Sequence, residues 1–336
     1  MRPARTPRAA APRTSVVSQA ARGLTGAVLG ALAARSAYRM LDRDGDRSPS
    51  WQRVNFRGRT VTLKEGPALA SGICAACVLA PGLTPRVRAA TSLAAAASAA
   101  FGAYDDLAGN TRAKGLRGHL GALAHGEVTT GTVKMAGIGA TGLAAASLLR
   151  RGPLDTLVDG ALIAASANLV NLLDLRPGRA VKFALLASAP ALASPAAPLV
   201  GPVLGASAAL LPDDLAERSM LGDAGANALG AALGVAAAAR APRPVRLALL
   251  GGVVGLTLAS ERVSFSQVIE RVPLLNRLDR WGCADAGAAG PDRRTADRTP
   301  SGAPSSGGTG RRRGAAQDGP ERVPRARRSA ASPAPG

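Results

Sequence analysis

The sequence Tyr104-Asp105-Asp106-Leu107-Ala108-Gly109 ends an apolar run and begins a polar one. No charged residue lies between Ala89 and Tyr104, and two carboxylates then follow together. Adjacent carboxylates at the end of an apolar helix repel each other and resist desolvation unless positive charge lies between them. A divalent cation carrying phosphate oxygens would supply that charge. The alternative is a pair that simply marks a solvated helix end.

Uncharged apolar windows recur along the chain, at residues 66–85, 89–104, 135–149, 160–173, 183–212, 224–239 and 247–260. Repeated windows near bilayer length, separated by short charged loops, predict a polytopic helical membrane protein. Small-residue pairs suit helices that pack closely in lipid, and four occur here: Gly26/Gly30, Gly201/Gly205, Gly230/Gly234 and Gly251/Gly255. We therefore expect an all-α fold, a polytopic transmembrane helical bundle with about nine spans.

We expect a disordered basic tail at residues 1–14, a membrane domain at 15–282 and a disordered tail rich in Gly, Pro, Ser and Arg at 283–336. The expected spans are residues 15–41, 66–82, 87–104, 131–149, 154–173, 226–239 and 244–260, with two more if 180–211 divides at its prolines. The first segment also resembles a signal peptide with a cleavage site at Ala31-Leu32-Ala33, but further spans follow it. Residues 261–282 either lie along the membrane surface or cap the bundle.

The net charge of +20 lies largely in the two tails and in residues 43–64. Aromatic residues make up only 2% of the chain, so stacking platforms for bases are nearly absent and no nucleic-acid partner is expected. Cys74 and Cys77 form a CxxC inside an apolar run without a second pair, which indicates two small buried residues rather than a metal site or disulfide framework. Cys283 falls in the expected tail.

Two further polar motifs lie at the ends of expected spans. Asn168, Asn171 and Asp174 follow one another at i, i+3 and i+6 and therefore share one helix face, which is typical of a polar cavity in a membrane protein. A helix end fraying into solvent explains Asp174 but not the deeper Asn168. The second motif is Leu221-Gly222-Asp223-Ala224-Gly225-Ala226-Asn227, where glycines allow a ligand to approach a helix N-terminus that attracts phosphate.

The three acidic motifs fall on one side of the membrane if residues 180–211 form two spans. A cytosolic Asp105 then makes Asp174 and Asp223 cytosolic as well. The loops on that side carry the excess of Lys and Arg, in agreement with the positive-inside rule. The Arg-rich N-terminal tail comes out on the opposite side, against that rule.

Together these motifs resemble those of the polyprenyl-phosphate N-acetylhexosamine-1-phosphate transferases, a superfamily that includes the phospho-N-acetylmuramoyl-pentapeptide transferase of peptidoglycan synthesis. Lys114-Gly115-Leu116 resembles the lysine segment of the family's first loop. The resemblance implies catalytic roles for Asp105, Asp106 and Asp174, and a Mg²⁺ (or Mn²⁺) site at Asp223 with Asp105. It also implies a set of substrate contacts: Asn168, Asn171, Lys114, Gly222, Gly225 and Asn227.

Three departures from the family pattern stand out. The family's Asp-Gly-x-Asp-Gly is Asp174-Leu-Arg-Pro-Gly178 here, which lacks a glycine and the second aspartate. The family's His-rich motif is missing, since the only histidines are His119 and His125. No apolar span follows residue 260, where the family has a last helix.

The expected function is that of a multi-pass plasma-membrane transferase with its site on the cytosolic face. It would move a sugar-1-phosphate from a UDP-sugar to a polyprenyl phosphate and release UMP in cell-envelope glycan assembly. The expected partners are these two substrates and the lipid bilayer, with a homodimer left open. The alternative is a non-catalytic relative that binds a lipid-linked precursor or an envelope-assembly partner. A transporter is disfavoured, because its polar residues would gather near mid-bilayer.

Overall fold

The computed structural model describes residues 15–43, 48–109 and 115–283. Its elements are α1 (Val16–Asp42), η1 (Pro49–Trp51), β1 (Gln52–Val54), β2 (Thr60–Thr62), α2 (Glu65–Leu79), α3 (Pro85–Ala108), α4 (Gly115–Ala124), α5 (Thr130–Leu148), α6 (Pro153–Leu173), α7 (Arg179–Ser188), η2 (Ala189–Ala193), α8 (Ala197–Leu215), α9 (Gly222–Arg240), α10 (Arg243–Ser260), α11 (Phe265–Arg271) and α12 (Pro273–Arg280). The described chain is therefore mostly helical.

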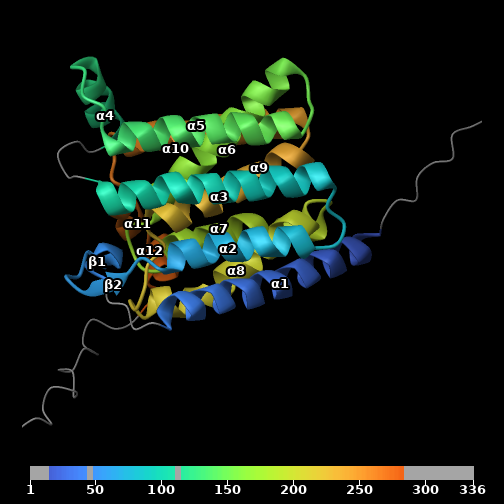
Figure 1. Cartoon of the computed structure of the whole chain (residues 1–336), viewed down its shortest axis with the longest axis horizontal. Helices are drawn as coiled ribbons and strands as arrows, with labels where there is room; N and C mark the ends of the chain where they lie inside the picture. Colours follow the sequence, from blue (N-terminus) through green and yellow to red (C-terminus); the bar gives the residue numbers. More distant parts are fainter. Residues whose placement is uncertain (1–14, 44–47, 110–114, 284–336) are drawn as a thin grey trace, which may run out of the picture. The chain divides into compact units, whose positions relative to one another are not determined.

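The long helices pack as two layers. Helices α1, α2, α3 and α5 each contact the next and lie side by side (Figure 1). Behind them α8 packs on α1, α9 on α2 and α3, and α6 on α5 and α9. The largest group of buried apolar side chains lies between these layers and includes Leu69, Ile73, Leu199 and Leu229. Helix α10 packs against α6 and buries only Arg246.

Glycines set the closest helix contacts. A Cβ added at Gly30 would lie 2.2 Å from the carbonyl oxygen of Pro202, and one at Gly205 would lie 1.8 Å from that of Ala27. Helices α1 and α8 therefore touch backbone to backbone, as small-residue pairs predict. The pair Gly230/Gly234 similarly faces α6. Gly251 and Gly255 have open space around them in the described structure, so this fourth pair marks no helix contact there.

Local sequence explains where the helices that carry the site begin. The Thr84 hydroxyl accepts a hydrogen bond from the amide of Val87, and Pro85 occupies the first turn of α3. The Thr129 hydroxyl caps α5 in the same way, at 3.1 Å from the amide of Thr132. These caps fix where α3 and α5 begin. Helix α3 carries Asp105 and Asp106 in its last turns, and α5 carries Lys134 near its start.

Three helices are long and apolar enough to cross a membrane, namely α1, α6 and α10, while α2 is a shorter apolar helix. The expected spans at 87–104, 131–149 and 226–239 form helices α3, α5 and α9, which do not meet the same criterion. Within the described residues the structure thus gives a mostly helical bundle with three candidate spans, and the expected count of about nine is not confirmed.

Residues 180–211 do not form two helices of similar length. Helix α7 has ten residues, η2 follows at Pro190, and only α8, with 19 residues, is long. Ten residues rise roughly 15 Å, about half the thickness of a bilayer core. The chain nevertheless returns to the end of the bundle at which α6 ends. Helix α7 and η2 lead away from that end, and α8 packs against both on the way back. Asp174 and Asp214 consequently lie at the same end.

The polar loop expected at residues 42–65 contains a β-hairpin, which the sequence did not predict. Strands β1 and β2 pair antiparallel with Arg53 opposite Val61, and Thr62 bridges to Ser219. Asn55 stabilises the turn by accepting hydrogen bonds from the amides of Arg57 and Arg59. The next polar loop likewise contains helix α4. The hairpin, α4, α11 and α12 gather at one end, on the left in Figure 1.

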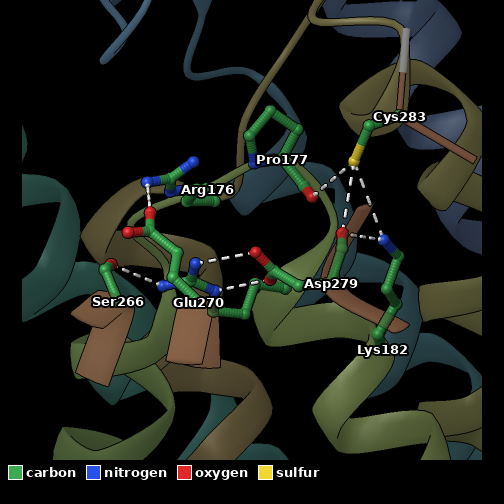
Figure 2. Close-up of polar contacts among 8 residues, drawn as sticks. Arg176, Pro177, Lys182, Ser266, Glu270, Asp279 and Cys283 are labelled. Carbon is green, nitrogen blue, oxygen red and sulfur yellow. Dashed lines mark hydrogen bonds and ion pairs between the residues drawn. The ribbon is translucent and has the colours of Figure 1, made fainter. Parts of the chain in front are cut away.

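Cys283 is not part of a free tail. Its thiol donates to the carbonyl of Asp279 at 3.4 Å and lies 3.7 Å from both the Pro177 carbonyl and the Lys182 ammonium (Figure 2). The rest of the expected C-terminal tail and residues 1–14 lie outside the described residues.

Candidate active site

Two carboxylate-bearing helix ends meet where α3 packs on α9. A Cβ added at Gly102 would lie 2.3 Å from the carbonyl oxygen of Asp223, so the two backbones are in direct contact there. One turn beyond Gly102, helix α3 ends with Asp105 and Asp106, while α9 begins with Gly222 and Asp223. The close packing therefore brings three carboxylates to one point.

Lys134 on α5 lies between two of these carboxylates. Its ammonium is 2.6 Å from Asp105 and also donates to a carboxylate oxygen of Asp223. The side chain of Lys134 is only 14% exposed. The acidic cluster thus already contains one cation belonging to the protein.

Asp106 caps the N-terminus of α9. Its carboxylate accepts a hydrogen bond from the amide of Ala224 at 3.0 Å. Gly222 has φ +59°, and a side chain there would press on Asp106 and Leu63, so glycine is needed for this approach. Arg53 of the hairpin donates to the Asp106 carbonyl and lies 3.8 Å from its carboxylate.

The carboxylates have different electrostatic environments. Burial raises the pKa of Asp106 to about 7, and the nearby charge of Asp223 adds to the effect. Burial also raises the pKa of Asp223, although Lys134 opposes it. For Asp105 burial acts in the same direction, but hydrogen bonds from Lys134 and Thr130 bring its pKa below the ordinary value. Lys134 therefore compensates Asp105 well, whereas Asp106 and Asp223 retain a mutual repulsion.

Asp174 adds a fourth carboxylate to the same end. It terminates α6 as the C-cap, and its amide donates to the carbonyl of Asn171. Burial raises its pKa well above the ordinary value, and the charges of Asp214, Asp223 and Asp106 raise it further. These electrostatic interactions place Asp174 near Asp106 and Asp223.

A pocket of about 310 Å³ opens beside Lys134 and Asp223. It is lined by Lys134, Asn168, Asn171 and Asn227, together with Thr257 and Glu261 from the end of α10. The side-chain amides of Asn168 and Asn171 have no hydrogen-bond partner among the described residues, and neither does the buried Thr257 hydroxyl. Unpaired amides in a confined polar pocket are available to a ligand.

A second pocket, of about 230 Å³, lies under the β-hairpin on the other side of Asp174. Arg53, Phe56, Asp174 and Arg176 line it, and the Arg176 guanidinium stacks over the Phe56 ring at 4.8 Å. The hairpin is held to the bundle by Glu217, which accepts from Asn55 and Arg57 at 2.7 Å each. This second pocket therefore also brings cationic side chains, Arg53 and Arg176, together with the carboxylate of Asp174.

A third cavity, of about 510 Å³, is mainly apolar and lies between α6, α7, α9 and α10. Leu162, Leu169, Phe183, Leu233 and Val253 are among its lining residues. It reaches Arg240, the last residue of α9, and Pro242, the N-cap of α10, and so extends away from the acidic end. Apolar chains are the ligands that such a surface can take.

The structure brings most of the predicted site residues that it describes together, with Gly225 as an exception. Asn227 contacts Asp223 by donating to its carbonyl at 2.7 Å. Gly225, predicted to let a substrate approach, instead packs on α2, since an added Cβ would lie 2.7 Å from the Cα of Gly66. Lys114 lies outside the described residues.

Sequence reasoning missed Lys134, Arg53 and Thr257. Lys134 carried a usable signal, because a charged residue one turn inside an otherwise apolar segment is costly unless it has a partner. Arg53 and Thr257 carried no such signal, since each reaches the site through the packing of a distant segment.

The donor chemistry of this centre suits Mg²⁺. Within the described ranges no group of three or more His, Cys, Asp or Glu side chains is placed so that it could hold a metal ion. Mg²⁺ sites that also use substrate phosphates need only one or two carboxylates, with waters completing the shell. Asp223 with Asp106 or Asp105 provides such oxygens, and the repulsion between Asp106 and Asp223 is what a cation would relieve.

No protein-family model matches the chain, and no curated protein matches it.

Proposed function

We propose that this protein is a membrane-embedded transferase that moves a sugar-1-phosphate from a UDP-sugar to a polyprenyl phosphate and releases UMP. The observation that carries the proposal is the meeting of Asp105, Asp106 and Asp223 around the ammonium of Lys134, beside a pocket with unpaired amides. Phosphoryl transfer needs positioned oxygens, cations and hydrogen-bond donors around one phosphate centre, and little else from the protein.

Each residue has a role that follows from its place. Asp223, with Asp106 or Asp105, would hold Mg²⁺, which supplies neutralisation of the diphosphate and polarisation of the phosphorus when bound. Lys134 would exchange a carboxylate contact for a diphosphate oxygen. The amides of Asn168 and Asn171 would orient the nucleotide-sugar in their pocket, and one carboxylate of the Asp105–Asp106 pair would accept the proton of the lipid phosphate.

The membrane setting supports the choice of a lipid acceptor. Three helices have the length and composition of spans, and the mainly apolar cavity of about 510 Å³ between α6, α7, α9 and α10 is large enough for part of an acyl or prenyl chain. On this proposal the protein lies in the plasma membrane, with the acidic end on the cytosolic side where UDP-sugars are found.

A second candidate is a non-catalytic relative that binds a lipid-linked precursor. The observation that favours it is Lys134 itself, whose ammonium takes the place between Asp105 and Asp223 that a cation would otherwise occupy. In such a protein the lysine would be the permanent counter-charge, and binding would not depend on Mg²⁺.

The deciding experiment measures UMP release by protein purified in detergent and supplied with polyprenyl phosphate, Mg²⁺ and a panel of UDP-sugars. Release that requires both the lipid phosphate and the metal supports the transferase. No release with any donor rejects it. In that case, binding of polyprenyl phosphate measured by calorimetry, with and without Mg²⁺, tests the non-catalytic candidate.

A further inference from the structure

Helices α11 and α12 are tied to the bundle through their acidic residues. Both carboxylate oxygens of Asp279 accept from the guanidinium of Arg179, at 2.7 and 2.9 Å, and Lys182 donates to the Asp279 carbonyl at 2.7 Å. Glu270 of α11 pairs with Arg176, as Figure 2 shows. This attachment orients α12 and decides which of its faces points outward.

The outward face of α12 is the apolar one. Leu274, Leu278 and Trp281 follow at i, i+4 and i+7 and share one helix face. Leu274 and Trp281 are 68% and 70% exposed, whereas the side chain of Asp279 is only 8% exposed. A helix packed on a protein in water normally has the opposite orientation, with leucines inward and charges outward. The exposed face therefore requires a partner that is apolar.

Arginines surround this apolar face. Arg271, Arg277 and Arg280 are exposed, and none has a side-chain partner among the described residues. Because Glu270 and Asp279 are already paired with the bundle, no acidic group of α11 or α12 remains to neutralise them. The outward surface of this segment thus combines leucines and a tryptophan with uncompensated positive charge.

The segment also lies where a membrane surface would be. It follows α10, a candidate span in which Arg246 is the one fully buried residue. With α10 in lipid, the chain leaves the bilayer at Ser260, and α11 begins at Phe265 after a connection of four residues. Leucines, tryptophan and arginines on one helix surface are the composition of helices that lie in the lipid headgroup layer.

We infer that the outward face of α12, with Arg271 of α11, binds the headgroup layer of a leaflet containing anionic phospholipid. Leu274, Leu278 and Trp281 enter the boundary between headgroups and acyl chains, and Arg271, Arg277 and Arg280 contact lipid phosphates. Each such arginine adds attraction to an anionic surface. The inference does not depend on the transferase proposal, since it uses none of the residues of the acidic end.

The test uses full-length protein in nanodiscs of phosphatidylcholine mixed with phosphatidylglycerol, where either lipid carries brominated acyl chains that quench nearby tryptophan. The signal of Trp281 is the difference between wild type and Trp281→Phe, which leaves Trp51 as background. We expect quenching by both brominated lipids and stronger quenching by brominated phosphatidylglycerol. Absence of quenching by either lipid means that the segment lies in water or against protein, and overturns the inference.

Two variants separate the apolar from the charged part of the surface. Arg271→Gln with Arg277→Gln should reduce the difference in quenching between the two brominated lipids, while Leu274→Gln with Leu278→Gln should weaken quenching by both. The control is Arg86→Gln, which removes an exposed arginine at the start of α3 and should change neither. Equal quenching by both lipids in the wild type would refute the preference for anionic lipid.

Discussion

Lys134 and Asp223 form an ion pair that joins α5 to α9, although 89 positions separate them in the sequence. The same ammonium contacts Asp105 on α3, so one lysine links three helices at the acidic end. Its removal would leave two partly buried carboxylates facing each other without compensation.

The first prediction concerns this lysine. Lys134→Met should lower the free energy of unfolding by about 3 kcal/mol, because breaking a largely buried pair leaves uncompensated charge. Lys134→Arg keeps the charge and should cost much less. Thermal unfolding of the purified protein in detergent measures both. Equal stability of wild type and Lys134→Met would show that the carboxylates are compensated in another way.

The second prediction tests the proposed metal role of Asp223. Asp223→Asn keeps the shape but removes the charge that would hold Mg²⁺, so UMP release should fall by about three orders of magnitude. Folding should change little, since Lys134 keeps Asp105 as its partner and Asp106 loses a like-charged neighbour. Asp42→Asn, at the exposed end of α1, is the control and should retain full turnover. Comparable turnover in wild type and Asp223→Asn would refute the metal assignment.

The third prediction concerns the backbone contact that aligns α3 with α9. Gly102→Ala places a Cβ 2.3 Å from the carbonyl of Asp223 and should cost about 1–3 kcal/mol through overpacking. UMP release should fall with it, because Asp105 and Asp106 shift relative to Asp223. Gly139→Ala on α5 meets open space and should be neutral or slightly stabilising. Similar melting temperatures for the two variants would mean that the helices separate easily at this point.

The fourth prediction is a pH dependence at the attachment of α12. Burial by itself raises the pKa of Asp279, but Arg179 brings it below the ordinary value of 3.8. A carboxylate with a lowered folded pKa stabilises the folded state above its unfolded pKa, and the effect disappears as the pH falls through the folded value. Hydrogen exchange in α12 should therefore be slow from neutral pH down to about pH 4 and relatively faster below it.

Asp279→Asn is the matched control for that experiment. At neutral pH the variant should show faster hydrogen exchange in α12 than the wild type. Its exchange should not accelerate further in acid, once the pH dependence of intrinsic exchange is subtracted. If wild type and variant respond to acid in the same way, then other groups govern the attachment.

The fifth prediction concerns the C-terminal tail. Deletion of residues 284–336 should leave folding and turnover nearly unchanged, since a chain rich in Gly, Pro, Ser and Arg cannot bury a core. Deletion from Pro273 onward also removes the Asp279–Arg179 pair and the contacts of Cys283, and should expose α7 to proteolysis. The yield of membrane-inserted protein and a proteolysis time course measure the two effects. Instability of the shorter deletion would reveal a structural role for the tail.

Several features follow from the sequence by itself. Helical character, the helix starts at Pro85 and Thr130, and the shared face of Asn168 and Asn171 depend on propensity, capping and the 3.6-residue repeat. These rules act over a few residues and hold wherever the helix lies. Acidic residues at helix ends could be found in the same way, because desolvation makes unpaired carboxylates rare inside apolar segments.

The tertiary structure decided which of these helix ends meet. Lys134 reaches Asp105 and Asp223 because backbone contacts at Gly102 and Gly66 bring α9 against α3 and α2, and a side chain at either glycine would prevent that approach. Asp279 could not be assigned to Arg179 from the sequence, since their contact depends on how a segment 100 residues away folds back. Local rules fix each helix, but packing between distant helices fixes which charges become neighbours, and only the folded chain determines it.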